Sequence, residues 1–260
     1  GAQDGPGATD VDLALAPRST GSTLKPFLYG LLLDQGRILP KQWLLDVPTR
    51  YGDFRPQNAS GSWEGLVPAN EALARSLNIP WVRQLRDLGV QPFHEFLRDA
   101  GLWHLFRPAE DYGLALGLGA GEASLAELVA LYAALGSDGV SRPLDVATSR
   151  DGIRSSIAGP PAGGGASGTL KAAHAAFRAG NSDASQSRRI LSPGATWLVL
   201  DALRLPGRTE EEASWKAWAG NRPVAWKTGT SFGHRDAWAI GVTPRWVVGV
   251  WAGNPMGDGR

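Results

Sequence analysis

Hydrophobic positions in the first part of the chain recur at intervals of three and four residues, a spacing typical of helices with one buried face. The clearest example begins after Gly21 and is expected to end at Gly36. Further helices are expected over residues 70–78, 80–89, 90–101, 124–136 and 192–207. Ser124 and Glu127 have the spacing of a capping box at the start of one helix, and Ser192 is placed to cap another.

The C-terminal end has a different pattern, in which short runs of β-branched and aromatic residues are separated by turn residues. Three such runs, PVAWKTGTS, DAWAIGVTP and RWVVGVWAG, occupy residues 223–231, 236–244 and 245–253. Their lengths and turns predict an antiparallel meander. Because helices come first and strands last, the fold class is expected to be α+β, with an antiparallel sheet flanked by helices and a helical lobe.

Two stretches show neither the helical spacing nor the strand-like runs described above. Residues 44–69 are rich in Pro, Gly, Asn and Ser and are expected to form a long irregular connection on the surface. Residues 146–189 are rich in Gly, Ala and Ser and are expected to be a flexible insertion, followed by a C-terminal helix and strands over residues 190–260. Residues 1–20 begin with Gly rather than Met and lack a signal-peptide pattern, so they are interpreted as the truncated approach to a domain over residues 21–260.

Composition excludes several classes of function. Of the 260 residues, 43% are hydrophobic, which is enough for a sizeable core. The formal net charge is +1 and no dense run of Lys and Arg occurs, so no nucleic-acid partner is expected. The chain has no Cys, which removes thiol nucleophiles, disulfides and Cys-type zinc sites; neither a metal nor a cofactor is expected. No apolar run approaches the roughly 20 residues that span a bilayer.

Three short motifs combine hydroxyl, amide and amine groups: STLK at residues 22–25, SLN at residues 76–78 and KTGT at residues 227–230. Each motif alone is weak evidence for a site. With 18 Ser, 5 Lys and 6 Asn in the chain, all three motifs in this order are expected in about one shuffled sequence in a thousand. The combination therefore favours a functional site over chance.

Ser22 and Lys25 have the spacing of a nucleophile and its base. One helical turn separates them, so the amine of Lys25 is expected to reach the Ser22 hydroxyl. A Lys with its ordinary pKa of about 10.4 is protonated and cannot accept a proton, but apolar neighbours and the second positive charge of Lys227 would lower that pKa. The helix N-terminus would also favour the negative charge that develops beside Ser22.

Each motif also has a purely structural interpretation. Ser22 alone would be a helix cap followed by an exposed Lys. SLN alone would be the polar end of a helix before Pro80, and KTGT alone would be a strand with a Gly bulge. The segment from His234 to Asp236 is interpreted as a turn with solvated charges rather than a catalytic pair. The Trp residues are interpreted as packing residues rather than a glycan groove; they include Trp63, Trp81 and Trp103.

Four segments resemble the transpeptidase domain of class A, bifunctional penicillin-binding proteins, particularly the 1C subgroup: RSTGSTLKPFLYGLLLDQG, ANEALARSLNIPWVRQL, LGLGAGEASLAELVALYAALGSDG and VAWKTGTSFGHRDAWAIGV. S-x-x-K and K-T-G with an intervening Ser-and-Asn motif are the signature of penicillin-binding proteins and related β-lactamases. The resemblance covers most of residues 19–254 apart from the Gly-rich insertion. It is most specific at PRSTGSTLKPF and WKTGTSFGHRDAWA.

The resemblance implies a serine D-Ala-D-Ala transpeptidase that cross-links peptidoglycan stem peptides and is acylated by β-lactam antibiotics. It implies Ser22 as the nucleophile and Lys25 as the base, with the backbone N–H groups of Ser22 and Thr230 as the oxyanion hole. Ser76 would pass a proton to the leaving D-Ala, and Asn78 would hold the substrate backbone. The residues that would line the opposite, strand side and bind the terminal carboxylate are Lys227, Thr228, Gly229 and Thr230.

The family also implies a five-stranded central sheet with two strands before the first motif. Residues 1–20 do not have the pattern of a hairpin, so the sheet is expected to be incomplete at the N-terminus. The domain is expected in the periplasm or otherwise outside the cytoplasm, with the parent protein anchored in the inner membrane. Two alternatives stay open: a D-Ala-D-Ala carboxypeptidase or β-lactamase that uses water as acceptor, and a penicillin sensor or scaffold module that is acylated once or never.

Overall fold

The three C-terminal runs form the antiparallel sheet that the alternation predicts. In the computed structural model, which describes residues 12–142, 144–147, 154–157, 187–205 and 223–254, strands β9 (Ala225–Thr230), β10 (Asp236–Val242) and β11 (Val247–Gly253) lie in the order β11-β10-β9. The pairing register places Lys227 opposite Ile240 and Trp238 opposite Trp251. The meander is therefore confirmed.

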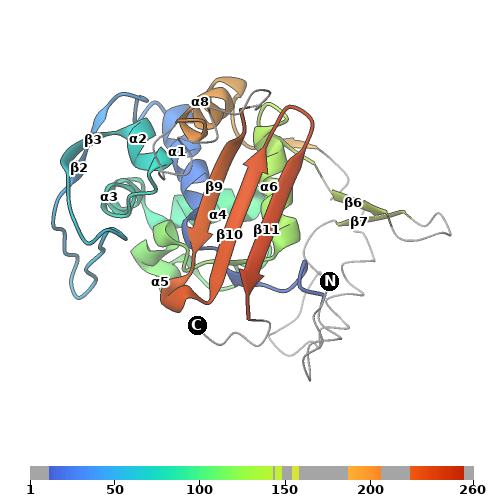
Figure 1. Cartoon of the computed structure of the whole chain (residues 1–260), viewed down its shortest axis with the longest axis horizontal. Coiled ribbons are helices and arrows are strands. Elements are labelled where there is room, and N and C mark those ends of the chain that lie inside the picture. The colour runs from blue at the N-terminus through green and yellow to red at the C-terminus, as the bar shows by residue number, and fades with distance from the viewer. Residues whose placement is uncertain (1–11, 143, 148–153, 158–186, 206–222, 255–260) are drawn as a thin grey trace.

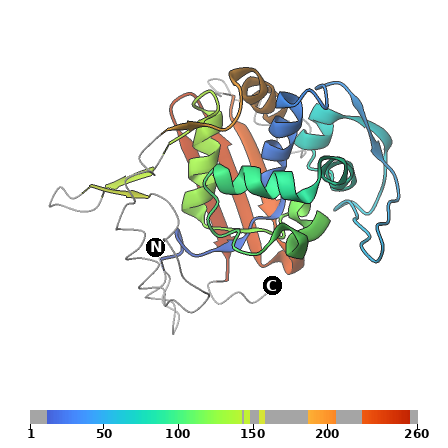
Figure 2. The same cartoon turned by 180° about the vertical axis from the view of Figure 1, so that it is seen from behind.

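Helices cover one face of this sheet, behind it in Figure 1 and in front of it in Figure 2. Those that contact the sheet or one another are α1 (Lys25–Asp34), α6 (Leu125–Leu135) and α8 (Pro193–Leu203). Aromatic and aliphatic side chains fill the layer between them; the rings of Phe27 and Tyr132, for example, meet edge to face with centroids 5.1 Å apart. The α+β class is confirmed, with its core between this helical layer and the sheet.

A second group of elements forms a helical lobe. Its helices are α2 (Ala69–Ala74), α3 (Ile79–Leu88), α4 (Val90–Asp99) and α5 (Ala109–Tyr112), and its strands are β2 (Trp43–Asp46) and β3 (Gly65–Pro68). In Figure 1, α2 and α3 lie beside the sheet and α4 lies behind it. Three short 3-10 helices also occur in the described residues: η1 (Gly21–Leu24), η2 (Gly113–Leu118) and η3 (Phe232–His234). Two-residue strands pair as β1 (Arg18–Ser19) with β4 (Glu122–Ala123) and as β5 (Val140–Ser141) with β8 (Arg188–Arg189).

Local sequence signals fix most helix ends as expected. Ser124 and Glu127 form a reciprocal capping box at the start of α6, and the Ser192 side chain accepts a hydrogen bond from the Ala195 N–H at the start of α8. Gly36 has a φ of 65°, which suits the residue after α1. Among the described helices, none is long and apolar enough to cross a bilayer.

The prediction of one irregular connection over residues 44–69 is wrong at both ends. Leu44 and Val67 are buried and pair across the β2–β3 ribbon, so the irregular part is limited to residues 47–64. The strand signal was hidden because the pairing is short and its partners are separated by about twenty residues of turn-forming sequence. This loop borders the candidate site.

The break between α2 and α3 also lies earlier than expected. The chain leaves α2 at Arg75, and Pro80 lies in the first turn of α3 rather than between two helices. Pro is well tolerated there because the first helical N–H groups have no intrahelical partner. The SLN motif consequently occupies the turn itself and not the polar end of a helix.

The predicted insertion over residues 146–189 lies mostly outside the described residues. Its described part includes an antiparallel ribbon, β6 (Leu144–Ala147) with β7 (Arg154–Ile157), which the composition did not predict. Its end contributes β8. The proposed division of the chain at residues 20 and 190 is not tested by this architecture.

Two glycines allow the backbone of β9 to lie directly against η1. A Cβ on Gly229 would lie 2.7 Å from both the Thr20 carbonyl oxygen and the Thr23 Cγ2. A Cβ on Gly21, whose φ is 53°, would lie 2.6 Å from the Thr230 backbone nitrogen. Such contacts are shorter than side-chain packing permits, so glycine at both positions is a condition for this approach.

We expect Gly229→Ala to lower the stability of the fold. The added methyl group must displace backbone, which costs about 1–3 kcal/mol and lowers the melting temperature by about 2–4 °C for each kcal/mol. Gly194→Ala is the matched control, because a Cβ there has only the Ser192 Oγ nearby, at 3.9 Å. Thermal unfolding followed by circular dichroism checks this, and equal melting temperatures for the two variants would contradict it.

Candidate active site

Three separate elements bring the three motifs to one place. Ser22 lies in η1 and Lys25 is the first residue of α1. Ser76 and Asn78 lie in the turn between α2 and α3, and Lys227 lies in β9. The site is thus formed where the sheet edge, the first helix and the helical lobe meet.

Lys25 is buried, with 1% of its surface exposed, and its amine points to the SLN turn. Lys25 Nζ donates to the Ser76 carbonyl oxygen at 2.8 Å and to Asn78 Oδ1 at 2.5 Å. The Ser76 hydroxyl oxygen lies 3.5 Å from the same nitrogen. The purely structural interpretation of STLK, a helix cap followed by an exposed Lys, therefore does not hold, because Lys25 is buried.

Lys227 approaches the same hydroxyl from the opposite side. It is also 1% exposed, and its Nζ donates to Ser76 Oγ at 2.7 Å and to the Thr228 carbonyl oxygen at 2.8 Å. The Ser76 hydroxyl consequently lies between two lysine amines. Because this hydroxyl accepts a hydrogen bond from Lys227, its own proton is free to point toward Lys25.

Burial and the neighbouring charge lower the pKa of Lys25 well below its ordinary value of 10.5, and loss of hydration is the larger cause. The second cause is the positive charge of Lys227, since two like charges in one buried cluster disfavour each other. A neutral amine has two N–H groups and one lone pair. The two short bonds to Ser76 and Asn78 use both N–H groups and leave the lone pair for a proton.

Ser22 lies where β9 touches η1. Its side chain is half-buried, and within the described residues its hydroxyl has no hydrogen-bond partner. Its backbone nitrogen lies 3.2 Å from the position of a Cβ on Gly229. The expected hydrogen bond between Ser22 and Lys25 is absent from this structure, because the Lys25 amine is occupied by Ser76 and Asn78 instead. The interpretation of Ser22 as a helix cap also fails, since Thr20 precedes η1 and no side chain caps it.

The strand residues alternate between the two faces of β9. Lys227 and Gly229 face the helices and are buried, whereas Thr228 and Thr230 are exposed. The close approach of Gly21 to the Thr230 backbone nitrogen places the end of the KTGT motif beside Ser22. The third motif therefore supplies a buried amine on one face of the edge strand and accessible hydroxyls on the other.

The SLN turn ends α2 with an uncommon residue at its left-handed position. The Leu77 N–H bonds the Ala72 carbonyl at 3.0 Å and the Ser76 N–H bonds the Leu73 carbonyl at 3.0 Å, which together form a Schellman motif. Glycine usually occupies the position of Ser76, whose φ is 58°. The Ser76 backbone is strained at this position, and its left-handed conformation places the hydroxyl between the amines of Lys25 and Lys227.

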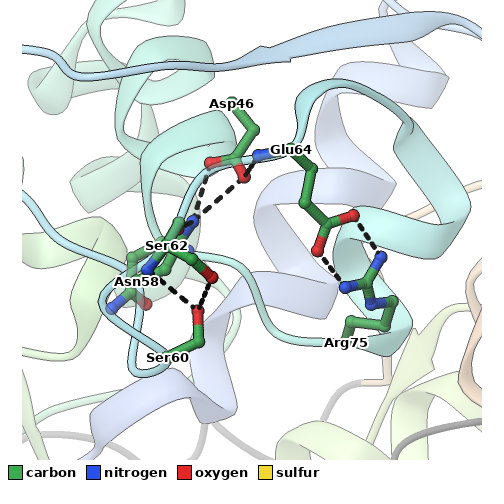
Figure 3. A network of polar contacts seen from close by, with 7 residues as sticks. Asp46, Asn58, Ser60, Ser62, Glu64 and Arg75 are labelled. Atoms are coloured by element: carbon green, nitrogen blue, oxygen red, sulfur yellow. Dashed lines mark hydrogen bonds and ion pairs between the residues drawn. The ribbon is translucent and has the colours of Figure 1, made fainter.

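Sequence reasoning missed two buried polar residues next to the motifs. Asn58 and Asp46 are 5% and 0% exposed, and Asn58 Nδ2 donates to Asp46 Oδ1 at 2.8 Å (Figure 3). The Asn58 Oδ1 accepts a hydrogen bond from the Asn78 N–H at 2.8 Å. Asn58 belongs to a loop of polar and turn-forming residues, so only its later contact with the SLN turn distinguishes it from its neighbours.

The His234–Asp236 turn and the Trp residues, which the sequence analysis interpreted as structural, differ in burial from residue to residue. His234 is exposed, but Asp236 is buried and accepts a hydrogen bond from Trp251 Nε1 at 3.0 Å, so the prediction of solvated charge is wrong for Asp236. The pairing of its backbone with the Ser231 side chain explains the burial, because it fixes the turn between β9 and β10. Trp81 is fully buried, whereas Trp63 is 49% exposed.

The described residues hold no group of three or more metal-ligating side chains. The groups that meet at the site are the hydroxyl of Ser76, the amines of Lys25 and Lys227 and the amide of Asn78. This donor set suits acyl transfer to a serine, in which an amine accepts the proton of the attacking hydroxyl.

The S-x-x-K, Ser-x-Asn and K-T-G motifs, which this fold brings into one cluster, are the signature of penicillin-binding proteins and related β-lactamases. A family model described as the penicillin binding protein transpeptidase domain matches residues 12–255. The chain belongs to this family. The expected resemblance and fold are confirmed.

Curated relatives support the same assignment. Penicillin-binding protein 1C of Escherichia coli is 37% identical over 247 residues, which cover 95% of this chain and 27% of that protein. Penicillin-binding protein 1F of Bacillus subtilis is 26% identical over 250 residues, which cover 94% of this chain and 31% of that protein. The chain thus spans less than a third of the length of either relative.

Solved structures share the fold. The PonA1 protein of Mycobacterium tuberculosis in complex with penicillin V has a TM-score of 0.68 and 22% identity, with 96% of this chain and 64% of that chain covered. The transpeptidase domain of Burkholderia pseudomallei penicillin-binding protein 3 has a TM-score of 0.67 and 17% identity, with 94% of this chain and 73% of that chain covered. At these identities the likeness concerns the fold.

We expect Ser76→Gly to be more stable than Ser76→Ala by about 1 kcal/mol, because both lose the hydroxyl but only glycine adopts a φ of 58° without strain. The pair isolates backbone strain from the loss of the side chain. Urea denaturation of both variants measures the difference. Equal stability, or a more stable alanine variant, would contradict the strain.

Proposed function

We propose that this chain is a serine acyltransferase that acts on the D-Ala-D-Ala end of peptidoglycan stem peptides, a DD-transpeptidase. The observation that carries the proposal is the Ser76 hydroxyl between the buried amines of Lys25 and Lys227, with the half-buried Ser22 three residues before Lys25. The lowered pKa of the buried Lys25 favours its amine as a proton acceptor. Family membership supports the reaction type.

In the first step, the Ser22 Oγ attacks the carbonyl carbon of the penultimate D-Ala and its proton passes to the Lys25 amine. Both residues lie within one helical turn, so a change of the lysine rotamer, with the amine still beside Asn78, brings the amine toward the hydroxyl. The carbonyl oxygen becomes an oxyanion. The backbone N–H groups of Ser22 and Thr230 stabilise it, since β9 and η1 are in backbone contact there.

In the second step, the bond between the two D-Ala residues breaks. The proton moves from Lys25 through the Ser76 hydroxyl to the leaving nitrogen, which departs as D-Ala. Asn78 holds the substrate backbone through its amide. The charge of Lys227 and the hydroxyls of Thr228 and Thr230 bind the terminal carboxylate, while Gly229 lets the strand approach closely.

The acyl group then passes to an amine of a neighbouring stem peptide, which forms the cross-link and releases Ser22. A β-lactam antibiotic presents a strained amide to the same hydroxyl, and ring opening leaves the drug attached to Ser22. The structural relative PonA1 was solved with penicillin V. By the same reasoning, penicillin is a ligand of this chain.

The parent protein of such a domain works outside the cytoplasm, where peptidoglycan is assembled. We place this domain in the periplasm, with the parent anchored in the inner membrane, as the assignment to penicillin-binding proteins supports. The chain covers 27% of that relative. Anchoring is accordingly a property proposed for the parent and not for the residues described.

Incubation with a fluorescent penicillin, followed by mass spectrometry of the proteolysed chain, tests the proposal. We expect one adduct, on the peptide that contains Ser22, and no adduct in Ser22→Ala, because that variant lacks the proposed nucleophile. Ser60→Ala is the matched control, since that hydroxyl is exposed and bonds Ser62 only. It is expected to be labelled like the wild type.

Labelling of Ser22→Ala to the wild-type extent would overturn Ser22 as the nucleophile. The lifetime of the adduct separates transpeptidase from hydrolase. A long-lived adduct with slow release of penicillin supports the acyl-transfer assignment. Rapid turnover of a chromogenic cephalosporin would instead assign a β-lactamase.

A further inference from the structure

Asn78 stands at the N-terminus of α3, yet its side chain does not cap that helix. An Asn at this position ordinarily accepts a hydrogen bond from an N–H of the first helical turn. Here the Asn78 side chain is used at both ends by other groups: Oδ1 accepts from Lys25 Nζ at 2.5 Å, and Nδ2 donates to the Gln57 carbonyl at 2.7 Å. The start of α3 therefore needs a cap from elsewhere.

Asn58 supplies that cap from the loop between β2 and β3. Its Oδ1 accepts hydrogen bonds from the Asn78 N–H at 2.8 Å and the Ile79 N–H at 3.3 Å. Asn58 is twenty residues before Asn78 in the chain, so this is a tertiary contact and not a local one. It satisfies backbone donors at the helix start that Asn78 leaves without a side-chain partner.

Asp46 holds the other end of Asn58. The Asn58 Nδ2 donates to both carboxylate oxygens, at 2.8 and 3.0 Å, and to the Ser62 carbonyl at 3.0 Å. The carboxylate also accepts the Glu64 N–H at 3.0 Å (Figure 3). Because Asp46 is fully buried, its bonds to Asn58 fix the amide in one orientation, with the oxygen toward α3.

The loop between β2 and β3 also contacts Arg75, the residue directly before the SLN motif. The Glu64 carboxylate forms an ion pair with Arg75, which lies directly before Ser76 (Figure 3). The SLN turn is thus held on both sides, by Asn58 at Asn78 and by Glu64 at Arg75. Both contacts begin at residues bonded to Asp46.

We propose that Asn58, oriented by the buried Asp46, is a positioning residue for acylation: it binds the N–H groups of Asn78 and Ile79 and so fixes the backbone from which the Asn78 amide holds Lys25. Asn58 acts through Asn78 and does not touch the reacting atoms. The inference rests on the proposed function, in which Lys25 is the base. It predicts that loss of Asn58 releases the backbone of the SLN turn and moves the Asn78 amide away from Lys25.

The test measures acylation by a fluorescent penicillin, with its rate constant separated from the binding constant, as a function of pH. We expect Asn58→Ala to lower the acylation rate constant about tenfold or more, with a small effect on binding, because the base is displaced. The Asn78 oxygen favours the protonated lysine, so its loss moves the acid limb of the rate profile to lower pH. Ser60→Ala is the control from the same loop and is expected to match the wild type.

A second pair of variants keeps the test decisive if Asn58→Ala unfolds. Asn58→Asp places two carboxylates against each other and is expected to slow acylation, whereas Asn58→Asp combined with Asp46→Asn restores one donor and one acceptor between positions 46 and 58. We expect the double variant to acylate at least several times faster than Asn58→Asp. A double variant no faster than Asn58→Asp would overturn the positioning role.

A folded Asn58→Ala with the wild-type rate and pH profile would also overturn the positioning role. Melting temperatures of all variants show which of them are folded. The wild-type adduct on Ser22 separates this inference from the proposed function. A wild type labelled at Ser22, together with an unaffected Asn58→Ala, removes the inference and leaves the acyltransferase assignment in place.

Discussion

The site depends on one buried contact, in which the Ser76 hydroxyl lies between the amines of Lys25 and Lys227. Burying two lysines together is costly, because each loses its hydration and each repels the other. Burial and the charge of Lys227 lower the pKa of Lys25 well below its ordinary value, which makes the loss of one of the two charges easier. The loss of hydration and the repulsion that make this burial costly are also what lower the pKa of Lys25. Stability and chemistry are therefore linked through a single cluster.

The rest of the fold keeps this cluster closed. Gly21 and Gly229 let η1 and β9 meet backbone to backbone, which places Ser22 and Lys227 on either side of one contact. The left-handed Ser76 turns its hydroxyl inward at the cost of backbone strain, and Asn58 holds the turn from a separate loop. Each device fixes backbone rather than side chains, as expected of a site whose amines must stay close while one of them moves.

Periodicity was sufficient to predict the meander and the capped helices, because each depends on neighbours within about fifteen residues. The three motifs lie far apart in the chain and were selected as a candidate site by their joint occurrence and by the family resemblance. Periodicity was insufficient for the β2–β3 ribbon, where pairing links distant residues, and for the break at Ser76, where a serine occupies a glycine position. The hydrogen bond expected between Ser22 and Lys25 also failed, since the amine finds better acceptors across the lobe boundary. Asn58 and Asp46, which bond each other, belong to no recognisable sequence motif. Local patterns selected the candidate site residues, and tertiary contacts determined their geometry.

The most direct measurement of this account is the titration of the Lys25 amine, followed by nitrogen NMR of the folded chain. With only 5 Lys in the sequence, comparison with Lys25→Met assigns the signal. The account predicts a Lys25 pKa well below 10.5 and a rise of that pKa in Lys227→Gln, because the second charge is removed. A Lys25 that titrates at its ordinary value, or that does not respond to the loss of Lys227, would contradict the central claim that the buried pair creates the base.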